Sequence, residues 1–532
     1  QMRMLSRFGM REGDAIEHGL LSKSVERAQR KVEERNFQRR KQILEYDEVM
    51  EHQRRSFYGL RQRVLEGRDV KGLIFDYIEE AIDESVTEML GRDFRAQRAA
   101  EYAAERLDTS IEFEKLRGKD LDELERTVRR LAIEESRANI VVTLGEYIPM
   151  EGSEIAVEFD SAGLVRWAKN DFGVEIDAGE LREGGAEERR HVQAVLEQAA
   201  EERIEAADLS GLSEFVDADY GYRRLAAWVE RKFGFTVTID ELRKGHETDG
   251  TTAAEPILTK ARDLYRRREI EYPVQVQMTM TRMAAGRPGG LEAALGELAQ
   301  WARRRFGAEL DAAKLRTTPL QKLEAQLFEY SEKWVDDDVL SKAIDEAVAI
   351  ESDDELDTHL TERFGQGITD RMRYLEGEDR DNAVRARVEN LLRAELLGAE
   401  RGLMLQLLDD QWRQHLYGMD QLRDSISFRA FSQQDPRIAY KREGSQLFST
   451  MMSQVRDRVT DLIFRVRFNP QAAMMNQMGL GGMQQAMPAA RPAAAPATRS
   501  VSQASAPSAP SASNSAATVP GLASAGSPRT AK

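Results

Sequence analysis

Apolar residues in the first part of the chain recur at helical spacing. From about residue 15 to residue 70 the stripe includes Val25, Val32, Ile43 and Leu60, and no proline interrupts it. Because residues three or four apart share one face of a helix, the pattern predicts one very long helix or a helix pair. A helix of this length cannot bury its stripe alone, so we expect a spine for other parts of the protein. The alternative is a solvated coiled coil.

Three segments in the middle of the chain repeat one pattern of apolar, aromatic and glycine residues. They are LVRWAKNDFGVEIDAGELR from Leu164, LAAWVERKFGFTVTIDELR from Leu225 and LAQWARRRFGAELDAAKLR from Leu298. In each, Leu precedes Trp by three residues, and Phe-Gly and Leu-Arg follow the Trp five and fourteen residues later. A partial fourth copy, LDTHLTERFGQGI, has His359 at the Trp position.

Each repeat predicts a helix, a tight turn and a second helix. The glycine occupies the position where a left-handed residue ends a helix. Asp177, Thr238 and Asp311 lie at the N-cap position of the next helix, and Glu180 and Glu241 complete capping boxes. The aromatic residues are predicted to form the core of duplicated helical modules; they are Trp167, Phe172, Trp228, Phe233, Trp301 and Phe306. A ligand cage and a DNA-reading helix-turn-helix are alternatives, and the acidic second helices disfavour the latter.

Two further amphipathic segments predict an αα-hairpin. RGLMLQLLDDQWRQHLYGMDQLRDSISF and REGSQLFSTMMSQVRDRVTDLIFRV flank a short polar turn that contains Pro436. After about residue 469 the composition changes to Met, Gln and Gly and then to Ala, Pro and Ser. Such a segment has too few large apolar residues to offset the entropy of ordering, so residues 469–532 are predicted to be disordered.

Composition narrows the possible functions. The net charge of -16 argues against nucleic acid as the main partner, because phosphate binding depends on a positive surface. Basic residues outnumber acidic ones between Lys23 and Arg68, which leaves an anionic partner such as lipid headgroups open. The absence of cysteine excludes disulfides, thiolate catalysis and cysteine-bound zinc. The sequence has no membrane-spanning apolar run and no signal peptide, and its opening at Gln1 in mid-pattern suggests a fragment.

No motif for catalysis or for cofactor binding is visible in the sequence. It contains no G-x-x-x-x-G-K-[ST] loop for nucleotide phosphates and no G-x-S-x-G nucleophile motif. The six histidines are scattered singly, so no metal site is predicted. We therefore expect no catalytic site, cofactor or metal in this chain.

Two long blocks resemble the SecA family of protein translocase ATPases. FGMREGDAIEH with AQRKVEERNFQRRKQILEYDEVMEHQRRSFYGLR is similar to the passage from the second SecA motor domain into the helical scaffold. RGLMLQLLDDQWRQHLYGMDQLRDSISFRAFSQQDPRIAYKREGSQLF is similar to the SecA two-helix finger, with its DxxWxxHL and QxDPxxxYKRE elements. Together the blocks cover about a third of the chain.

The resemblance implies a division of the chain into parts. Residues 1–12 would end the second motor domain, 13–70 would be the long scaffold helix, and 71–394 would be an enlarged helical wing. The wing would hold the repeats at about 160–215, 218–275 and 289–345, with a partial copy at 353–380. Residues 395–468 would be the scaffold return and finger. This wing is several times longer than usual, and we interpret it as multiplied by internal duplication. Our hypothesis for the extra copies is a surface on which a partner docks.

The resemblance also implies a function for the finger and for the protein as a whole. The finger tip, Phe431 with Arg429 and Gln433, would enter the SecY channel and touch an unfolded secretory preprotein. ATP and Mg²⁺ would bind upstream motor domains, and the protein would work in the bacterial cytoplasm and on the cytoplasmic face of the inner membrane. The tail lacks the Cys/His zinc motif of many members, which puts the chaperone contact made through that motif in doubt.

The sequence thus predicts an all-α fold: a long scaffold helix, duplicated helix-turn-helix wing modules, an αα-hairpin finger and a disordered tail. The function implied is the C-terminal mechanical part of a SecA-type motor. Two other functions stay open at this point. One is a non-enzymatic helical-repeat scaffold or adaptor, and the other is a helical nucleic-acid-binding protein that would bind through Arg27–Arg63 in a salt-dependent way.

Overall fold

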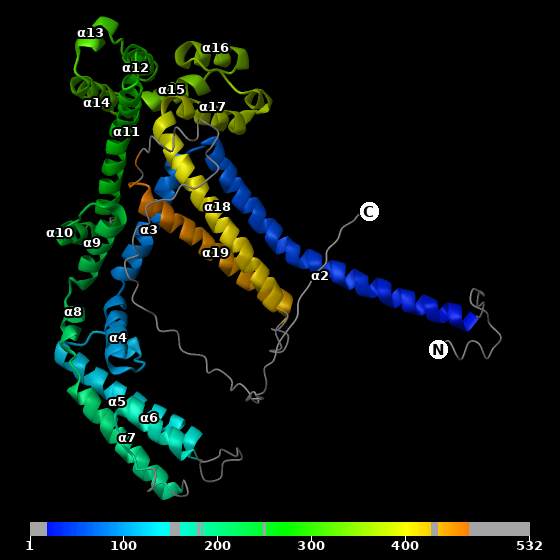
Figure 1. Cartoon of the computed structure of the whole chain (residues 1–532), viewed down its shortest axis with the longest axis vertical. Helices are drawn as coiled ribbons and strands as arrows, with labels where there is room; N and C mark the ends of the chain where they lie inside the picture. The colour runs from blue at the N-terminus through cyan, green and yellow to red at the C-terminus, as the bar shows by residue number, and fades with distance from the viewer. Residues whose placement is uncertain are drawn as a thin grey trace, which may run out of the picture. The chain divides into compact units, whose positions relative to one another are not determined.

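The computed structural model describes residues 19–148, 160–177, 181, 185–247, 252–426, 435–465 and 467. The chain divides into two units, Gln1–Phe468 and Asn469–Lys532, and the second unit, with the predicted disordered tail, lies outside the described residues. Every regular element of the described residues is a helix, which confirms the all-α prediction (Figure 1). The elements are α2 (Gly19–Glu66), α3 (Val70–Met89), α4 (Phe94–Leu107), η2 (Phe113–Leu116), α5 (Leu121–Tyr147), α6 (Ser161–Phe172), α7 (Ala186–Ala206), η3 (Ser210–Leu212), α8 (Ser213–Val216), α9 (Tyr220–Phe233), α10 (Ile239–Glu247), α11 (Ala254–Ala285), α12 (Gly290–Phe306), α13 (Ala312–Thr317), α14 (Leu320–Asp336), α15 (Val339–Val348), α16 (Asp353–Phe364), η4 (Asp370–Tyr374), α17 (Gly377–Leu392), α18 (Ala394–Ser425) and α19 (Pro436–Leu462).

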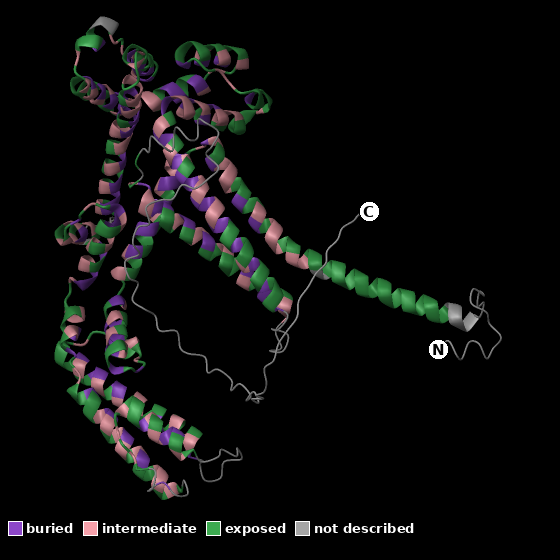
Figure 2. Cartoon of the chain, in the orientation of Figure 1, coloured by how far each residue is buried: buried purple, intermediate pink, exposed green. Residues whose placement is uncertain are grey.

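The predicted spine is one uninterrupted helix, α2, of 48 residues. It ends at Gly67, whose φ of +72° is a left-handed conformation that glycine adopts without a steric penalty. The C-terminal part of α2 packs on α18 and α19 and contributes Phe57 and Val64 to the largest hydrophobic cluster. The N-terminal part is exposed (Figure 2), so the two parts of this helix have different surroundings.

The four repeats share one helix ending. Each first helix ends at the glycine of its Phe-Gly pair, and each glycine has a φ between +66° and +81°. In all four the glycine N–H donates to the carbonyl four residues earlier, which satisfies one of the free acceptors at the helix end. The glycines are Gly173, Gly234, Gly307 and Gly365. The duplication seen in the sequence is therefore also a duplication of backbone geometry.

The second helix of the repeat differs among the copies. The second and third copies have it, as α10 and α13, and the partial fourth copy continues into the 3₁₀ turn η4. In the first copy residues 178–180 and 182–184, including Glu180, lie outside the described residues. The capping box of the second copy is formed: the Thr238 N–H donates to Glu241 Oε2 at 2.8 Å, and the Glu241 N–H donates to Thr238 Oγ1 at 3.2 Å.

Each module packs against longer helices rather than standing alone. The first belongs to a cluster with α5 and α7, the second to the central cluster with α3, α11 and α19, the third to a cluster with α11 and α14, and the fourth to a cluster with α15 and α17. The leucine three residues before each Trp has no exposed surface. Since modules of this size cannot bury their aromatic face alone, the long helices complete their cores.

The last two described helices, α18 and α19, run side by side as the predicted hairpin (Figure 1). The Asp435 side chain caps α19 by accepting from the Arg437 N–H, and Pro436 occupies the first turn, where no backbone donor is needed. The tip, residues 427–434, lies outside the described residues.

Candidate functional site: the joint between the hairpin and the long helix

The hairpin and α2 meet along a line of paired side chains. On α18 the pairing residues are spaced by three, and on α2 they are spaced by four, which places each set on one helix face. The pairs are Asp409 with Arg61, Trp412 with Phe57, and His415 with Gln53. The three α18 residues are those of the DxxWxxHL element, so this element forms the contact surface for the long helix.

The first pair is a two-point ionic contact. Arg61 donates from Nε to Asp409 Oδ1 at 2.7 Å and from Nη2 to Oδ2 at 3.0 Å. The hydrogen bond to Asp409 raises the pKa of the Arg61 guanidinium. Parallel N–H···O bonds of this kind fix the relative orientation of the two groups as well as their distance.

The second pair is an aromatic stack in the core. The Phe57 and Trp412 rings lie 4.3 Å apart, centroid to centroid, with 7° between their planes. Tyr58 meets the edge of Trp412 at 6.0 Å. Phe57 is 1% exposed, so most of its surface is removed from water by the hairpin. Buried aromatic pairs are among the larger contributions to such contacts.

The third pair is a buried hydrogen-bond chain across three helices. Gln53 donates from Nε2 to the Gly444 carbonyl of α19 at 2.9 Å, and its Oε1 lies 2.8 Å from His415 Nε2. Because Gln53 already uses its amide N–H₂ on a carbonyl, His415 is assigned as the donor, with its proton on Nε2. Burial lowers the pKa of His415 and keeps the ring neutral.

Contacts nearer the hairpin tip involve the YKRE element of α19. The Tyr440 ring meets Tyr46 edge-on at 4.7 Å, and Arg437 donates to both oxygens of Glu45 at 3.3 Å. Arg437 also bonds Asp435, and this contact lowers the pKa of the Asp435 carboxyl. The described parts of both family elements quoted above therefore face α2. The spacing of the elements marks these hairpin residues in the sequence, but it does not say which residues of α2 they contact.

The root of the hairpin holds a buried polar cluster. Tyr265 of α11 donates to Glu400 Oε1 at 2.6 Å and accepts from Arg393 Nη2 at 2.6 Å. Arg393 Nη2 also lies 3.3 Å from Glu269, which bonds Lys71 of α3 at 3.0 Å. Burial raises the pKa of Glu400, and the charge of Arg393 opposes that shift. Because a buried charge without partners is costly, this cluster ties α3, α11 and α18 to one arrangement.

The predicted tip residues, Phe431, Arg429 and Gln433, lie outside the described residues. The predicted aromatic core residues of the repeats form three equivalent pairs. In each module the Trp and Phe rings meet edge-on, with centroids 5.2–5.5 Å apart and planes within 4° of perpendicular. The pairs are Trp167–Phe172, Trp228–Phe233 and Trp301–Phe306. This is a favourable aromatic geometry, and it is repeated with the sequence.

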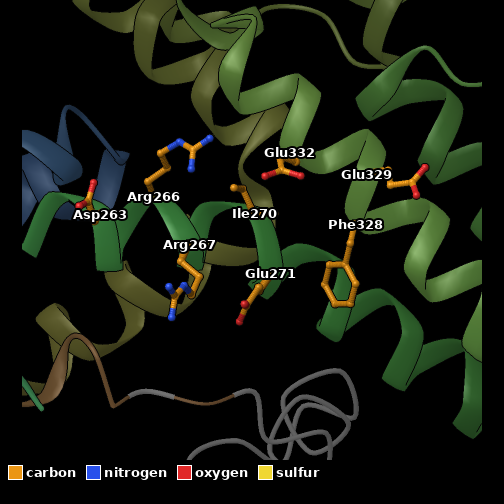
Figure 3. Close-up of a pocket in the computed structure, with 8 residues that line it drawn as sticks. All are labelled: Asp263, Arg266, Arg267, Ile270, Glu271, Phe328, Glu329 and Glu332. Carbon is orange, nitrogen blue, oxygen red and sulfur yellow. The ribbon is translucent and has the colours of Figure 1, made fainter. Parts of the chain in front are cut away.

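A groove between α11 and α14 is a second place where a ligand could be sought. The groove has a volume of roughly 530 Å³. Figure 3 shows the eight side chains that line it. The volume is in the range of small-molecule sites, but the lining holds four carboxylates, two arginines and only two apolar residues. Arg266 pairs with Asp336 at its side. We assign the groove no ligand.

Two other findings concern the part of the chain that the structure describes. It contains no group of three or more acidic or histidine side chains placed to hold a metal ion. None of its helices combines the length and the apolar character needed to cross a bilayer.

Comparison with known proteins gives one family. The chain matches the family described as "SecA Wing and Scaffold domain" over residues 15–285 and 313–467. It is 29% identical, over 87% of its length, to protein translocase subunit SecA 1 of Rhodopirellula baltica and spans 38% of that protein. Over 16% of its length the chain is 51% identical to protein translocase subunit SecA of Trichodesmium erythraeum, and this match covers 9% of that relative. Over 23% of its length the chain is 35% identical to protein translocase subunit SecA of Endomicrobium trichonymphae, and this match covers 15% of that relative.

Proposed function

The chain belongs to the SecA wing and scaffold domain family, and on that premise we propose that it is the C-terminal mechanical part of a SecA-type preprotein translocase. In this proposal, ATP hydrolysis in motor domains outside this chain moves unfolded preproteins through the SecY channel. ATP and Mg²⁺ bind those domains, since this sequence has no phosphate-binding loop. The printed name of the relatives, protein translocase subunit SecA, supports the assignment.

The observation that carries the proposal is the joint between the hairpin and α2. An ion pair, an aromatic stack and a buried hydrogen-bond chain hold α18 against one face of α2. Protein interiors are close-packed and have low compressibility, so they transmit displacement instead of absorbing it. When α2 moves, the hairpin would therefore move with it.

The exposed surface of the N-terminal half of α2 is a second observation that supports the proposal. Its apolar residues Val25, Val32 and Phe37 are each more than half exposed, and so are Ile43 and Leu44 just past the middle of the helix. Figure 2 shows this end of α2 as exposed. Exposed apolar stripes of this length mark surfaces that a partner covers. We propose that the motor domains of the same protein cover it, so that α2 connects the nucleotide engine to the hairpin.

The tip of the hairpin is the proposed contact with the moving polypeptide. In this proposal Phe431, flanked by Arg429 and Gln433, enters the cytoplasmic mouth of SecY. A flat apolar ring suits an unfolded chain of any sequence, because it requires no particular side chain as partner. The protein would work in the bacterial cytoplasm and on the cytoplasmic face of the inner membrane, with anionic lipid as a further surface and without nucleic acid.

Photocrosslinking from the tip tests the proposal. A benzoylphenylalanine in place of Phe431 in the whole protein should crosslink to SecY and to a preprotein stalled during ATP-driven translocation. The matched control is the same group in place of Tyr374, an aromatic residue of η4 that is 86% exposed. We expect ATP-dependent adducts from the first position and none from the second.

Two results would contradict this function. Equal adduct yields from both positions would show nonspecific contact. A protein that carries this chain, binds no ATP and forms no SecY adduct would instead be a scaffold or adaptor built on the same helices.

A further inference from the structure

The family match leaves out residues 286–312, and this stretch contains α12, the first helix of the third module. The buried residues of α12 face α11 and α14, where Leu295, Leu298 and Ala302 join a shared cluster. Two of its side chains extend beyond this cluster, to the start of the hairpin. They are Trp301 and Arg305, one helical turn apart.

Trp301 and Arg305 bind the two oxygens of one carboxylate, that of Glu395 in the first turn of α18. Trp301 donates from Nε1 to Oε1 at 2.6 Å, and Arg305 donates from Nη1 to Oε2 at 3.0 Å. Arg305 also donates to the Leu392 carbonyl at the end of α17. The Arg305 guanidinium lies over the Trp334 ring, 4.8 Å from its centroid, and Arg305 is only 7% exposed.

These contacts span a break in the helix. α17 ends at Leu392 and α18 begins at Ala394, and the residue between them, Arg393, has non-helical dihedral angles of -114° and 24°. A break of this kind is where two successive helices can change their mutual angle. Arg305 holds a carbonyl before the break and a carboxylate after it, so it limits that change.

In the second module, the residue at the position equivalent to Arg305 contacts the other hairpin helix, α19. The residue four places after the Trp is Lys232 in the second module and Arg305 in the third. Lys232 is nearly buried, and its Nζ lies 3.4 Å from Asp457 and 3.2 Å from Asp461, near the end of α19. In the partial fourth copy the equivalent Arg363 pairs with Glu346 inside its own cluster. The repeat therefore supplies one basic residue to the root of each hairpin helix.

We propose that Trp301, Arg305 and Glu395 form a latch that fixes the direction in which α18 leaves the body of the protein. The third module is then a positioning element for the hairpin and not a spacer. The contact itself stands on the geometry above; its use in moving a preprotein rests on the proposed function.

The test measures the direction of α18 in the full chain. The chain has no cysteine, so Arg413→Cys on α18 and Lys322→Cys on α14, both exposed, provide the only two positions for spin labels. We expect Arg305→Met to broaden the distance distribution and to speed deuterium exchange of residues 394–404 by roughly tenfold, as for loss of a local anchor. Arg363→Met, which removes the equivalent residue of the fourth copy, should change neither.

A milder variant protects the test against misfolding. Arg305→Lys keeps a positive charge beside Glu395 but loses the planar guanidinium that lies over the Trp334 ring, so its broadening should lie between wild type and Arg305→Met. An unchanged distribution with unchanged exchange in both Arg305 variants would overturn the latch.

The purpose of the latch is tested separately, in the whole protein. We expect Arg305→Met to slow preprotein translocation several-fold while ATP hydrolysis continues. Broadening without any change in translocation would overturn the positioning role. A wild-type protein that translocates nothing would overturn the proposed function and leave the spin-label result in place.

Discussion

The two halves of α2 share one backbone but have opposite surroundings. In the C-terminal half Phe57 and Val64 are 1% and 0% exposed, because the hairpin covers them. In the N-terminal half Val32 and Phe37 are 57% and 56% exposed, and no described residue covers them. Figure 2 shows this end of α2 as exposed. The apolar spacing is helical in both halves, so the difference lies in the partner and not in the helix.

This difference shows what can and what cannot be inferred from an apolar stripe on a helix. A stripe identifies the face of a helix that avoids water. It does not say which element covers that face. In α2 one part of the stripe is completed within this chain, and the other part is left for a partner outside it. The helix can therefore connect two bodies only if both halves are covered in the whole protein.

Removing one aromatic ring from each half should give the largest difference in stability between the two halves of α2. Phe57→Ala removes a ring stacked on Trp412 and should cost about 3–5 kcal/mol of stability at the joint, the usual range for a buried Phe. The matched substitution Phe37→Ala, on the exposed half, should leave the stability of this chain unchanged. Deuterium exchange of the α18 amides measures both.

The same two variants can also show that the two halves of α2 do not differ. A loss of α18 protection in Phe37→Ala as large as in Phe57→Ala would mean that the N-terminal half is already packed within this chain. In the whole protein, by contrast, Phe37→Ala should become destabilising if the motor domains cover it.

A smaller effect on the stability of the joint is expected when the pH is lowered, and it comes from His415 in the covered half. Burial lowers the pKa of His415 below its ordinary 6.5, so the folded joint binds fewer protons than the unfolded chain below that pH. Its contribution is therefore complete above pH 6.5 and is lost as the pH falls towards the lowered value. Protonation adds a charge to the buried ring while the Nε2–H bond to Gln53 persists, so the protection of α18 amides should fall as the pH drops below 6.5.

Two substitutions isolate this effect. His415→Gln should reduce the pH dependence of α18 exchange between pH 7.5 and 5.5, while His52→Gln, on the exposed side of the same α2 turn as Gln53, should not. An identical slope in wild type and His415→Gln would assign the pH response to other groups.

The helices and their endings could be predicted because their causes are local. The Phe-Gly pair fixes a left-handed glycine, as at Gly234, and Thr238 with Glu241 forms the capping box, each within a few residues. The long helix and the hairpin followed from periodicity, and the family assignment is confirmed by the match over most of the chain.

The joint and the latch could not be predicted because their causes are distant in sequence. Arg61 and Asp409 are 348 residues apart, and the register of two helices depends on every contact between them. The latch could not be predicted for a further reason: the position four places after the Trp is basic in the second and third copies, as Lys232 and Arg305, but nothing near it in the sequence indicates that Arg305 contacts Glu395, 90 residues away. The roles of the tip residues stay predictions, since Phe431 and its neighbours lie outside the described residues.

The smallest expected difference concerns two ion pairs of nearly equal length. Arg30 lies 2.6 Å from Glu26 on the exposed half of α2, and Arg61 lies 2.7 Å from Asp409 at the joint. Distance alone would rank them together. The first pair, however, is 77% and 59% exposed and joins one turn to the next, while the second is 31% and 42% exposed, binds at two points and joins two helices.

Double-mutant cycles should therefore separate the pairs. Arg61→Met with Asp409→Asn should give a coupling of about 0.5–1 kcal/mol, reduced from a buried pair's value by solvent screening. Arg30→Met with Glu26→Gln should give no measurable coupling, because water replaces each partner. Raising the salt concentration should weaken the first coupling only in part, since the contact is half-covered. Equal couplings for the two pairs would mean that the ion pair of Asp409 adds no more to the joint than an exposed pair does, and that the other contacts, such as the Phe57–Trp412 stack and the His415–Gln53 hydrogen bond, hold the hairpin to α2.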